Sequence, residues 1–320
     1  MIKVEHLTKK YGERYAVNDI SFEVHDGEVV GFLGSNGAGK TTTMNIITGY
    51  LSSTSGSAMI DGKDVLEFPM EVKRKIGYLP EFPPLYQEMT VEEYLGFIYD
   101  LKKCELNKKE HIDEVCSVVK ITNEKKRLIK NLSKGYKQRV GIAGAIIGNP
   151  EVIIFDEPTN GLDPRQIIDI RNLIKELGQT HTVILSTHIL SEVKAICDRI
   201  IIINDGRIVS DVGTKDIDTE LKTEKKLMVR VCGPQGPVAS ELKKIPGVTF
   251  AGMTTDYKDG SEAFLVMSQK DIDVRKPVFN AMAKNQWPII EMTYMNGSIE
   301  DVFISVVDED EKNALKNSKE

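Results

Sequence analysis

Residues 34 to 41 read GSNGAGKT and match the pattern G-x-x-x-x-G-K-[ST] in full. Glycines let the backbone N–H groups of such a loop turn inward around phosphate oxygens, at angles that other residues resist. A helix expected from about Lys40 adds unpaired N–H groups and the positive end of its dipole. A plain glycine turn is the alternative. The apolar strand before the loop and the helix after it favour binding of a phosphate.

Individual positions of this loop have separate chemical tasks. The Lys40 ammonium group should reach the β- and γ-phosphates of a nucleoside triphosphate, where it would also stabilise the charge transferred during hydrolysis. The Thr41 hydroxyl should ligate Mg²⁺. Contacts with the nucleotide are expected from the whole segment: Gly34, Ser35, Asn36, Gly37, Ala38, Gly39, Lys40, Thr41 and Thr42.

Two acidic residues follow the apolar run VIIF at 152–155. Asp156 should emerge at the end of a strand, where its carboxylate can be directed at a metal ion. Glu157 should point differently because side chains alternate along a strand. One carboxylate would then serve Mg²⁺ and the other would polarise the attacking water, as triphosphate hydrolysis requires. An Asp-Glu pair in a solvated loop is the alternative, which the phosphate loop upstream disfavours.

The elements that position these residues follow from the hydropathy pattern. Residues 1–25 alternate apolar and polar positions, as half-buried strands do. Continuous apolar runs predict strands buried on both faces at 27–34, 151–158 and 181–188. Strands that alternate with helices predict an α/β fold with a mainly parallel sheet, covered on both faces.

Helices are expected at three places in this region: 90–103, about 108–120 and about 165–177. The first opens with Thr90 and has Glu93 three residues later, which is the pattern of a capping box. Asn107 is the expected N-cap of the second. Helical segments thus fall between the predicted strands.

The composition changes at about 205–226, where the sequence becomes polar and charged. We therefore expect a first domain at 1–215, a linker at 216–226 and a second domain at 227–306. The second domain has the order β-α-β-β-α-β, with strands at 227–232, 247–253, 263–268 and 288–295 and helices at about 238–245 and 271–285. This order predicts a small α+β, ferredoxin-like unit. A terminal helix over SIEDVFISVV and a disordered acidic tail at 307–320 should follow.

Composition, net charge and the length of apolar runs argue against a nucleic-acid-binding, a membrane-spanning and a secreted protein. The chain has 320 residues, of which 41% are hydrophobic and 28% charged, as in ordinary soluble proteins. Its net charge of −6 gives no support for a nucleic-acid partner. No apolar run approaches the roughly 18 residues of a membrane-spanning helix, and the first residues do not resemble a secretory signal. The four cysteines have no metal-ligand or paired spacing and are expected to be reduced thiols in the cytosol.

Taken in order, the motifs resemble those of the ATP-binding subunits of ABC transporters. LSKGYKQR at 132–139 is similar to the family signature, NGLDP at 160–164 to the D-loop, and LSTHIL at 185–190 to the switch-histidine segment. KKYG at 9–12 resembles the adenine-stacking segment. The resemblance covers about residues 2–215. It implies a P-loop NTPase fold with a mainly parallel sheet, an antiparallel β subdomain and a helical subdomain at about 85–150.

The resemblance also implies roles for single residues. Tyr11 would stack on adenine, although Tyr15 is close and a surface tyrosine needs no ligand. Ser133 and Gly135 fall at the expected start of a helix, where a hydroxyl and free N–H groups form an anion site. In the family this surface closes over the γ-phosphate bound by the partner subunit; a simple Ser N-cap is the alternative. His188 would contact the γ-phosphate, the alternative being a satisfied core histidine.

The chain departs from the family pattern at three positions. Lys134 replaces the first glycine of the signature pair and Tyr136 its glutamine, while Ser133 and Gly135 remain, so the anion contact should survive. Glu81 stands where the family usually has a glutamine that meets Mg²⁺ and relays the nucleotide state to the membrane subunit. We expect Glu81 to keep this role as a metal ligand. A solvent-facing Glu81 is the alternative.

These implications define the expected function. The chain should bind ATP and Mg²⁺, pair with a second ATP-binding subunit, most simply its own copy, and power export through a separate polytopic membrane subunit. It would then lie at the cytoplasmic face of the cell membrane. GYLPE together with LSKGYKQRV resembles the exporter branch with gliding-motility-type, sodium-extrusion-type and multidrug-type subunits. The rivals are a soluble ABC-type ATPase acting on ribosomes or DNA, and a regulatory module without catalysis.

Overall fold

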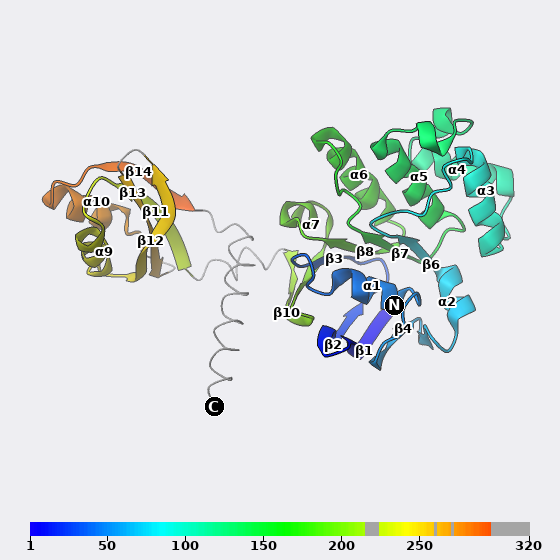
Figure 1. The fold of residues 1–320 in the computed structure, drawn as a ribbon, viewed down its shortest axis with the longest axis horizontal. Helices are drawn as coiled ribbons and strands as arrows, with labels where there is room; N and C mark the ends of the chain where they lie inside the picture. Colours follow the sequence, from blue (N-terminus) through cyan, green and yellow to red (C-terminus); the bar gives the residue numbers. More distant parts are fainter. Residues whose placement is uncertain (215–223, 259–260, 270–271, 296–320) are drawn as a thin grey trace. The chain divides into compact units, whose positions relative to one another are not determined.

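The computed structural model describes residues 1–214, 224–258, 261–269 and 272–295. Its contacts divide the chain after Thr214 into two units. The first unit contains a mainly parallel sheet, an antiparallel sheet and the helices around them (Figure 1). The second contains one sheet and two helices.

The central sheet of the first unit has the strand order β10-β9-β3-β8-β7-β6. Its strands are β3 (Val29–Leu33), β6 (Ile76–Leu79), β7 (Val152–Asp156), β8 (Thr182–Thr187), β9 (Arg199–Asn204) and β10 (Arg207–Gly213). All neighbours pair in parallel except β10, which runs antiparallel to β9. Every residue of β3, β7 and β8 is buried, so the three continuous apolar runs correctly predicted strands covered on both faces.

The second sheet of this unit is antiparallel, with the order β2-β1-β4-β5. Its strands are β1 (Ile2–Tyr11), β2 (Arg14–Val24), β4 (Ser55–Ile60) and β5 (Lys63–Asp64). Helix α1 (Lys40–Ile47) lies between the two sheets (Figure 1). Phe22, Phe32 and Met44 meet in the core there, with ring centroids of the two phenylalanines 5.6 Å apart. This core fixes the helix whose N-terminus carries Lys40.

Helices α6 (Pro164–Leu177) and α7 (Leu190–Ile196) cover the other face of the central sheet (Figure 1). The remaining helical elements are α2 (Pro69–Lys75), α3 (Val91–Lys102), α4 (Lys108–Val118), α5 (Lys134–Ile146) and 3₁₀ turns at Thr122–Glu124 and Ile129–Asn131. The capping box of Thr90 and Glu93 at α3 is confirmed, and so is the Asn107 cap of α4. Helix α4 ends at Val118, slightly before the expected residue 120.

The second unit has the strand order β12-β13-β11-β14, and all its strand pairs are antiparallel. Its elements are β11 (Glu224–Val231), α9 (Gln235–Lys243), β12 (Val248–Lys258), β13 (Ser261–Gln269), α10 (Arg275–Lys284) and β14 (Ile289–Met295). Val238 and Val278 of the two helices pack in one core with Val229 and Phe264 of the sheet.

Several boundaries in this unit differ from the expectation, and β12 continues to Lys258 where the expected strand ended at 253. Strand β11 begins at Glu224, inside the segment expected as a linker. Helix α9 begins earlier than the expected residue 238, and α10 begins at Arg275 rather than at 271. The Asp273 carboxylate accepts hydrogen bonds from the backbone and side chain of Arg275, which marks the start of α10. The expected terminal helix and acidic tail lie outside the described residues.

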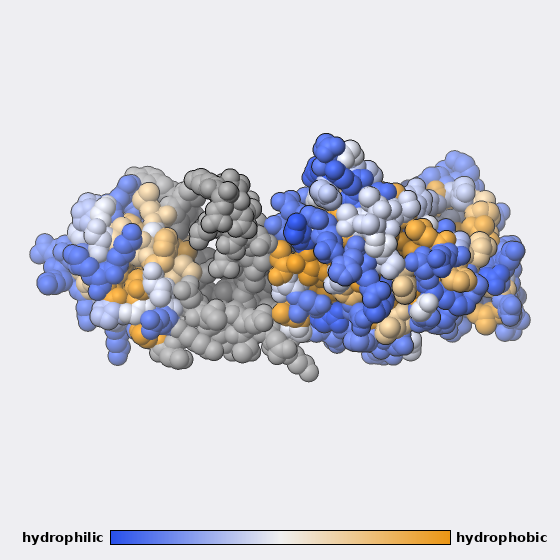
Figure 2. Space-filling model, turned by 90° about the horizontal axis from the view of Figure 1, so that it is seen from below, coloured by the Kyte–Doolittle hydropathy of each residue, from blue (hydrophilic) through white to orange (hydrophobic). Residues whose placement is uncertain are grey.

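The surface of the first unit is mostly hydrophilic on the face that Figure 2 shows, with separate hydrophobic patches. Large exposed apolar side chains include Tyr50, Phe82 and Leu101. Among the described residues, no helix combines the length and the apolar character needed to cross a bilayer.

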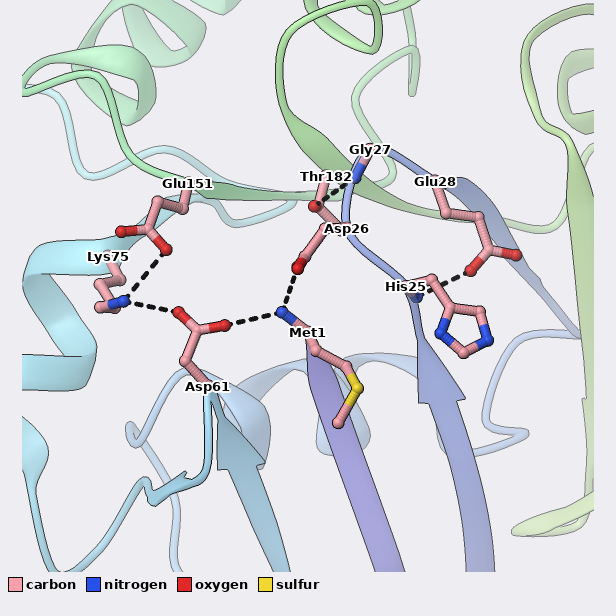
Figure 3. Close-up of polar contacts among 9 residues, drawn as sticks. All are labelled: Met1, His25, Asp26, Gly27, Glu28, Asp61, Lys75, Glu151 and Thr182. Carbon is pink, nitrogen blue, oxygen red and sulfur yellow. Dashed lines mark hydrogen bonds and ion pairs between the residues drawn. The ribbon is translucent and has the colours of Figure 1, made fainter.

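A network of charges joins the two sheets near the first residues of β1, β3 and β7 (Figure 3). The Met1 amino group contacts the carboxylates of Asp26 and Asp61. Asp61 also accepts a hydrogen bond from Lys75 Nζ at 2.6 Å, and the same ammonium donates to Glu151 at 3.0 Å. Although burial acts in the opposite direction, Lys75 and the amino terminus lower the pKa of Asp61 well below its ordinary value.

We expect Asp61→Asn to lower the free energy of unfolding at pH 7 by about 1 kcal/mol and Tm by about 2–4 °C, since the network is partly solvated. Because the pKa of Asp61 is lower in the folded state, its contribution is complete at neutral pH and fades as the pH falls below about 4. Thermal unfolding of both proteins between pH 7 and about pH 2 checks this, because the Tm difference should shrink only below about pH 4. An equal Tm difference at all pH values, or none at pH 7, would contradict the assignment.

Candidate active site

The phosphate loop joins the end of β3 to the start of α1. Gly37 and Gly39 have φ angles of 85° and 111°, which residues with side chains rarely adopt. A Cβ atom on Gly39 would lie 2.4 Å from the carbonyl oxygen of Ala16. Gly39 also gives α1 no side-chain cap, so the N–H groups of the first helical turn are available to an anion.

The Lys40 side chain is turned into this loop and is 5% exposed. Its Nζ atom donates hydrogen bonds to the carbonyl oxygens of Gly34 at 2.8 Å and Ser35 at 3.1 Å. Nζ also lies 3.3 Å from Oε1 of Glu157, which forms a buried ion pair. Lys40 and Glu157, which are 117 positions apart by their residue numbers, are thus brought together.

Glu157 contacts His188 as well as Lys40. Oε2 of Glu157 lies 2.9 Å from Nδ1 of His188. Glu157 follows the last residue of β7, has a φ of 49°, and its N–H donates to the carbonyl oxygen of Ser186 at 2.9 Å. This left-handed backbone, rather than the expected strand alternation, turns Glu157 away from Asp156.

Asp156, the last residue of β7, has no solvent exposure. Neither of its carboxylate oxygens has a hydrogen-bond partner of good geometry among the described residues. Burial is the main cause that raises the pKa of Asp156; the nearby hydroxyls of Ser186 and Thr41 oppose this, and Glu157 and Glu81 add to it. A buried carboxylate without partners is costly, and a cation beside it would remove that cost.

The oxygen atoms near the phosphate loop fit a magnesium ion whose remaining ligands would come from bound phosphate and water. Thr41 and Asp156 offer a hydroxyl and a carboxylate, which are ligands that Mg²⁺ uses. The described part of the chain contains no cluster of three or more His, Cys, Asp or Glu residues that could hold a metal by itself. Mg²⁺ commonly takes only one or two carboxylates and completes its shell with phosphate oxygens and water.

The cavity at the phosphate loop, which we call the loop cavity, has a volume of about 690 Å³. Its lining comes from five segments of the first unit: Tyr11, Arg14, Ala16, Asn36, Gly37, Gly39, Lys40, Thr41, Thr42, Glu81, Glu157, Asn160 and His188. Tyr11 is among these residues and Tyr15 is not, which favours Tyr11 as the stacking residue. Sequence reasoning missed Arg14 and Asn160. Arg14 pairs with Tyr11 across the β1–β2 hairpin, so a hairpin predicted at these residues could have placed Arg14 next to the expected stacking residue.

Glu81 lies in the wall between the loop cavity and a second, apolar cavity of about 660 Å³. Thr41, Glu81 and Asp156 border this apolar cavity, whose other walls include Tyr50, Leu79, Phe82, Pro83, Ile98 and Leu101. The Glu81 Oε1 atom accepts a hydrogen bond from Asn160 Nδ2 at 2.9 Å. Glu81 is therefore engaged with the segment that follows the acidic pair.

The residues that resemble the family signature lie outside the loop cavity. Ser133 is the N-cap of α5 and accepts a hydrogen bond from the Tyr136 N–H at 3.4 Å. Ser133 and Lys134 are exposed, whereas Gly135 is buried against Gln166. None of Ser133, Lys134 and Gly135 lines the loop cavity. One copy of the chain does not bring the signature to its own phosphate loop.

Comparison with known proteins finds a matching family model and similar sequences. A family model described as ABC transporter matches residues 17–160. The bacitracin transport ATP-binding protein BcrA of Bacillus licheniformis is 40% identical over 214 residues, or 66% of this chain and 69% of BcrA. The uncharacterized ABC transporter ATP-binding protein YxlF of Bacillus subtilis is 32% identical over 312 residues, or 96% of this chain and 99% of YxlF.

Solved structures of ATP-binding cassettes have a similar fold. The dimeric structure of MJ0796, a bacterial ABC transporter cassette, has a TM-score of 0.62 and 28% identity, and the match covers 67% of this chain and 99% of that one. A second dimeric structure of MJ0796, in a post-hydrolysis state with ADP and Pi, matches with a TM-score of 0.62 and 27% identity, over 67% of this chain and 99% of that one. Fold and site therefore define a P-loop NTPase. The chain belongs to the ABC transporter family, as an ATP-binding subunit.

Proposed function

We propose that this chain hydrolyses ATP with Mg²⁺, that two copies dimerise around two nucleotides, and that the cycle powers export through a separate membrane subunit. One observation carries the proposal: Lys40, Glu157 and His188 converge on the loop cavity, whereas the signature residues do not reach it. The site is complete only when a second chain supplies its signature.

Different residues of the loop cavity bind the nucleotide, hold the metal ion and carry out the hydrolysis. Tyr11 stacks on adenine, and the residues from Gly34 to Thr42 hold the phosphates through N–H groups. Thr41 and Asp156, with Glu81, hold Mg²⁺, which neutralises charge on the phosphate oxygens when it is bound.

Glu157 acts as the base that orients or deprotonates the attacking water. In this structure Glu157 is paired with Lys40. When phosphates bind, the Lys40 ammonium group pairs with them instead. Glu157 then keeps its contact with His188. His188 keeps Glu157 oriented and contacts the γ-phosphate.

Dimerisation follows from the position of the signature. Ser133, Lys134 and Gly135 open α5, where an exposed hydroxyl and helix N–H groups can receive the γ-phosphate held by the other chain. The dimeric MJ0796 structures support this geometry by similarity. Cleavage of the γ-phosphate removes the group that bridges the two chains, so the dimer opens.

The membrane subunit is proposed to dock at the apolar cavity. Phe82, which is 80% exposed, and Tyr50 and Leu101 offer apolar contact there. Glu81 borders both cavities and can report the nucleotide state to a docked partner. The name of BcrA, a bacitracin transport ATP-binding protein, supports a role in transport. We propose that the direction is export and that the chain belongs to the exporter branch with gliding-motility-type, sodium-extrusion-type and multidrug-type subunits. Its place is then the cytoplasmic face of the cell membrane.

The second unit is proposed to be an accessory domain of ferredoxin-like type. Its observed strand order and its two helices agree with the β-α-β-β-α-β pattern. We place the ATP-binding domain at 1–215 and the core of the accessory domain at 227–306, with its first strand β11 reaching back to Glu224 into the linker, and the tail from 307. The match with YxlF extends over nearly the whole chain, which supports an accessory domain shared with that relative.

Affinity purification from detergent-solubilised membranes tests this function. A polytopic membrane protein that co-purifies with the full chain and stimulates its Mg²⁺-dependent ATPase supports the proposal. Co-purification of ribosomal proteins would instead favour an ABC-type ATPase of the soluble class. The net charge of −6 argues against DNA or RNA as a partner.

We expect Glu81→Gln to raise the Mg²⁺ concentration needed for half-maximal ATPase several-fold, because an amide is a weaker ligand than a carboxylate. A Mg²⁺ titration of ATPase activity measures this, with exposed Glu67→Gln as the matched control. Unchanged rate and unchanged Mg²⁺ dependence would show that Glu81 does not ligate the metal.

A further inference from the structure

A buried carboxylate that has none of the roles above lies behind the loop cavity. Glu192 of α7 is 1% exposed. Its Oε2 atom accepts hydrogen bonds from the hydroxyl groups of Thr159 at 2.8 Å and Thr187 at 3.1 Å. Both threonines are buried as well. Because a buried carboxylate is stable only with its partners in place, the three side chains fix one another.

The two threonines flank the proposed catalytic pair. Thr159 lies two residues after Glu157, and Thr187 immediately precedes His188. Glu157 and His188 contact each other at 2.9 Å. The contacts therefore close a ring: Glu192 joins the two segments on one side, and the Glu157–His188 contact joins them on the other.

Two further contacts make this ring specific. The Thr187 hydroxyl oxygen accepts a hydrogen bond from the Ile189 N–H at 3.1 Å, which fixes the backbone turn through His188. Nη2 of Arg171 on α6 lies 3.6 Å from Oε1 of Glu192 and compensates its charge. A glutamine at position 192 keeps the shape, but it removes the charge that faces Arg171.

We propose that Glu192 is a positioning residue for ATP hydrolysis, which holds Glu157 and His188 in register through Thr159 and Thr187. The inference rests on the proposed function of that pair. Thr159 belongs to the segment that runs into the NGLDP loop and on to α6, the helix that carries Arg171. The same contacts thus tie this loop to the catalytic pair.

The first test uses the nucleotide-free full chain and does not depend on activity. The ring resonances of His188, followed by NMR in protein with labelled histidine, report its contact with Glu157. We expect Glu192→Gln to shift these resonances toward their position in the Glu157→Gln protein, and Thr187→Val to do the same. Exposed Glu176→Gln on α6 is the matched control and should leave them unchanged. Unchanged His188 resonances in both Glu192→Gln and Thr187→Val would overturn the inference.

The second test is kinetic. We expect Glu192→Gln to lower kcat about 10- to 100-fold, because small misplacement of a base has large effects, while the affinity for ATP changes little. On a His188→Ala background the same substitution should lower kcat by no more than about twofold, since both changes act on one geometry. An equal loss on both backgrounds, or a loss that follows Tm alone, would contradict a positioning role.

Failure of the proposed function can be distinguished from failure of the inference about Glu192. If the parental chain shows no ATPase activity with its membrane partner, the proposed function is wrong, while the NMR experiment still tests the ring. If Glu192→Gln does not fold, Thr159→Val and Thr187→Val remove single hydroxyl donors without changing the buried charge. Each should lower kcat and preserve ATP affinity; a parental kcat in both would refute the inference.

Discussion

Glu157→Gln should lower the kcat of ATP hydrolysis at least about 100-fold, which is the usual contribution of a general base. The amide keeps the size of the side chain but cannot accept a proton from water. ATP should still bind, because Tyr11, the phosphate loop and Lys40 are intact. Removal of the buried negative charge next to Lys40 also frees the ammonium for the phosphates. Steady-state ATPase assays and equilibrium binding of ATP measure the two effects separately.

Exposed Glu105→Gln is the matched control and should keep parental turnover and ATP affinity. A Glu157→Gln protein that hydrolyses ATP at the parental rate would remove Glu157 from its catalytic role. Loss of both binding and turnover would point instead to a damaged phosphate loop.

Lys40→Ala should weaken ATP binding about 10- to 100-fold, because the charged hydrogen bonds to the phosphates are lost. The same change leaves Glu157 buried without its ammonium partner in the nucleotide-free protein. Breaking a buried ion pair from one side typically costs about 3 kcal/mol or more, so Tm should fall as well. Isothermal titration calorimetry and thermal unfolding provide the measurements.

The double variant Lys40→Ala/Glu157→Gln separates these causes. It contains no uncompensated buried carboxylate at position 157, so Tm should recover in part while ATP binding stays weak. Exposed Lys175→Ala is the control for a lost surface charge. If the double variant is no more stable than Lys40→Ala, the ion pair does not contribute as described.

The local features of this chain were predictable because short-range physics determines them. Continuous apolar runs gave the buried strands β3, β7 and β8, and the pattern of Thr90 and Glu93 gave the start of α3. The glycine spacing of the phosphate loop requires left-handed backbone at Gly37 and Gly39, which the structure has. Each of these signals lies within a few residues of the feature that it predicts.

Features that depend on tertiary contacts could not be predicted in this way. The left-handed backbone of Glu157 follows from its bond to Ser186 of the neighbouring strand, not from the strand pattern. In sequence Glu192 resembles any acidic residue of a surface helix, and only the packing of α7 against the sheet shows that it is buried. The contact of Glu81 with Asn160 likewise joins segments that are distant in sequence.

We propose that ATP holds two copies of this chain together and that hydrolysis releases them. Sedimentation velocity of the full-length Glu157→Gln protein with Mg²⁺, alone and with its membrane subunit, tests the claim most directly. We expect a dimer with ATP and a monomer with ADP or without nucleotide, and loss of the dimer when Ser133→Arg is added. A Glu157→Gln protein that binds ATP and remains monomeric in both settings would contradict it.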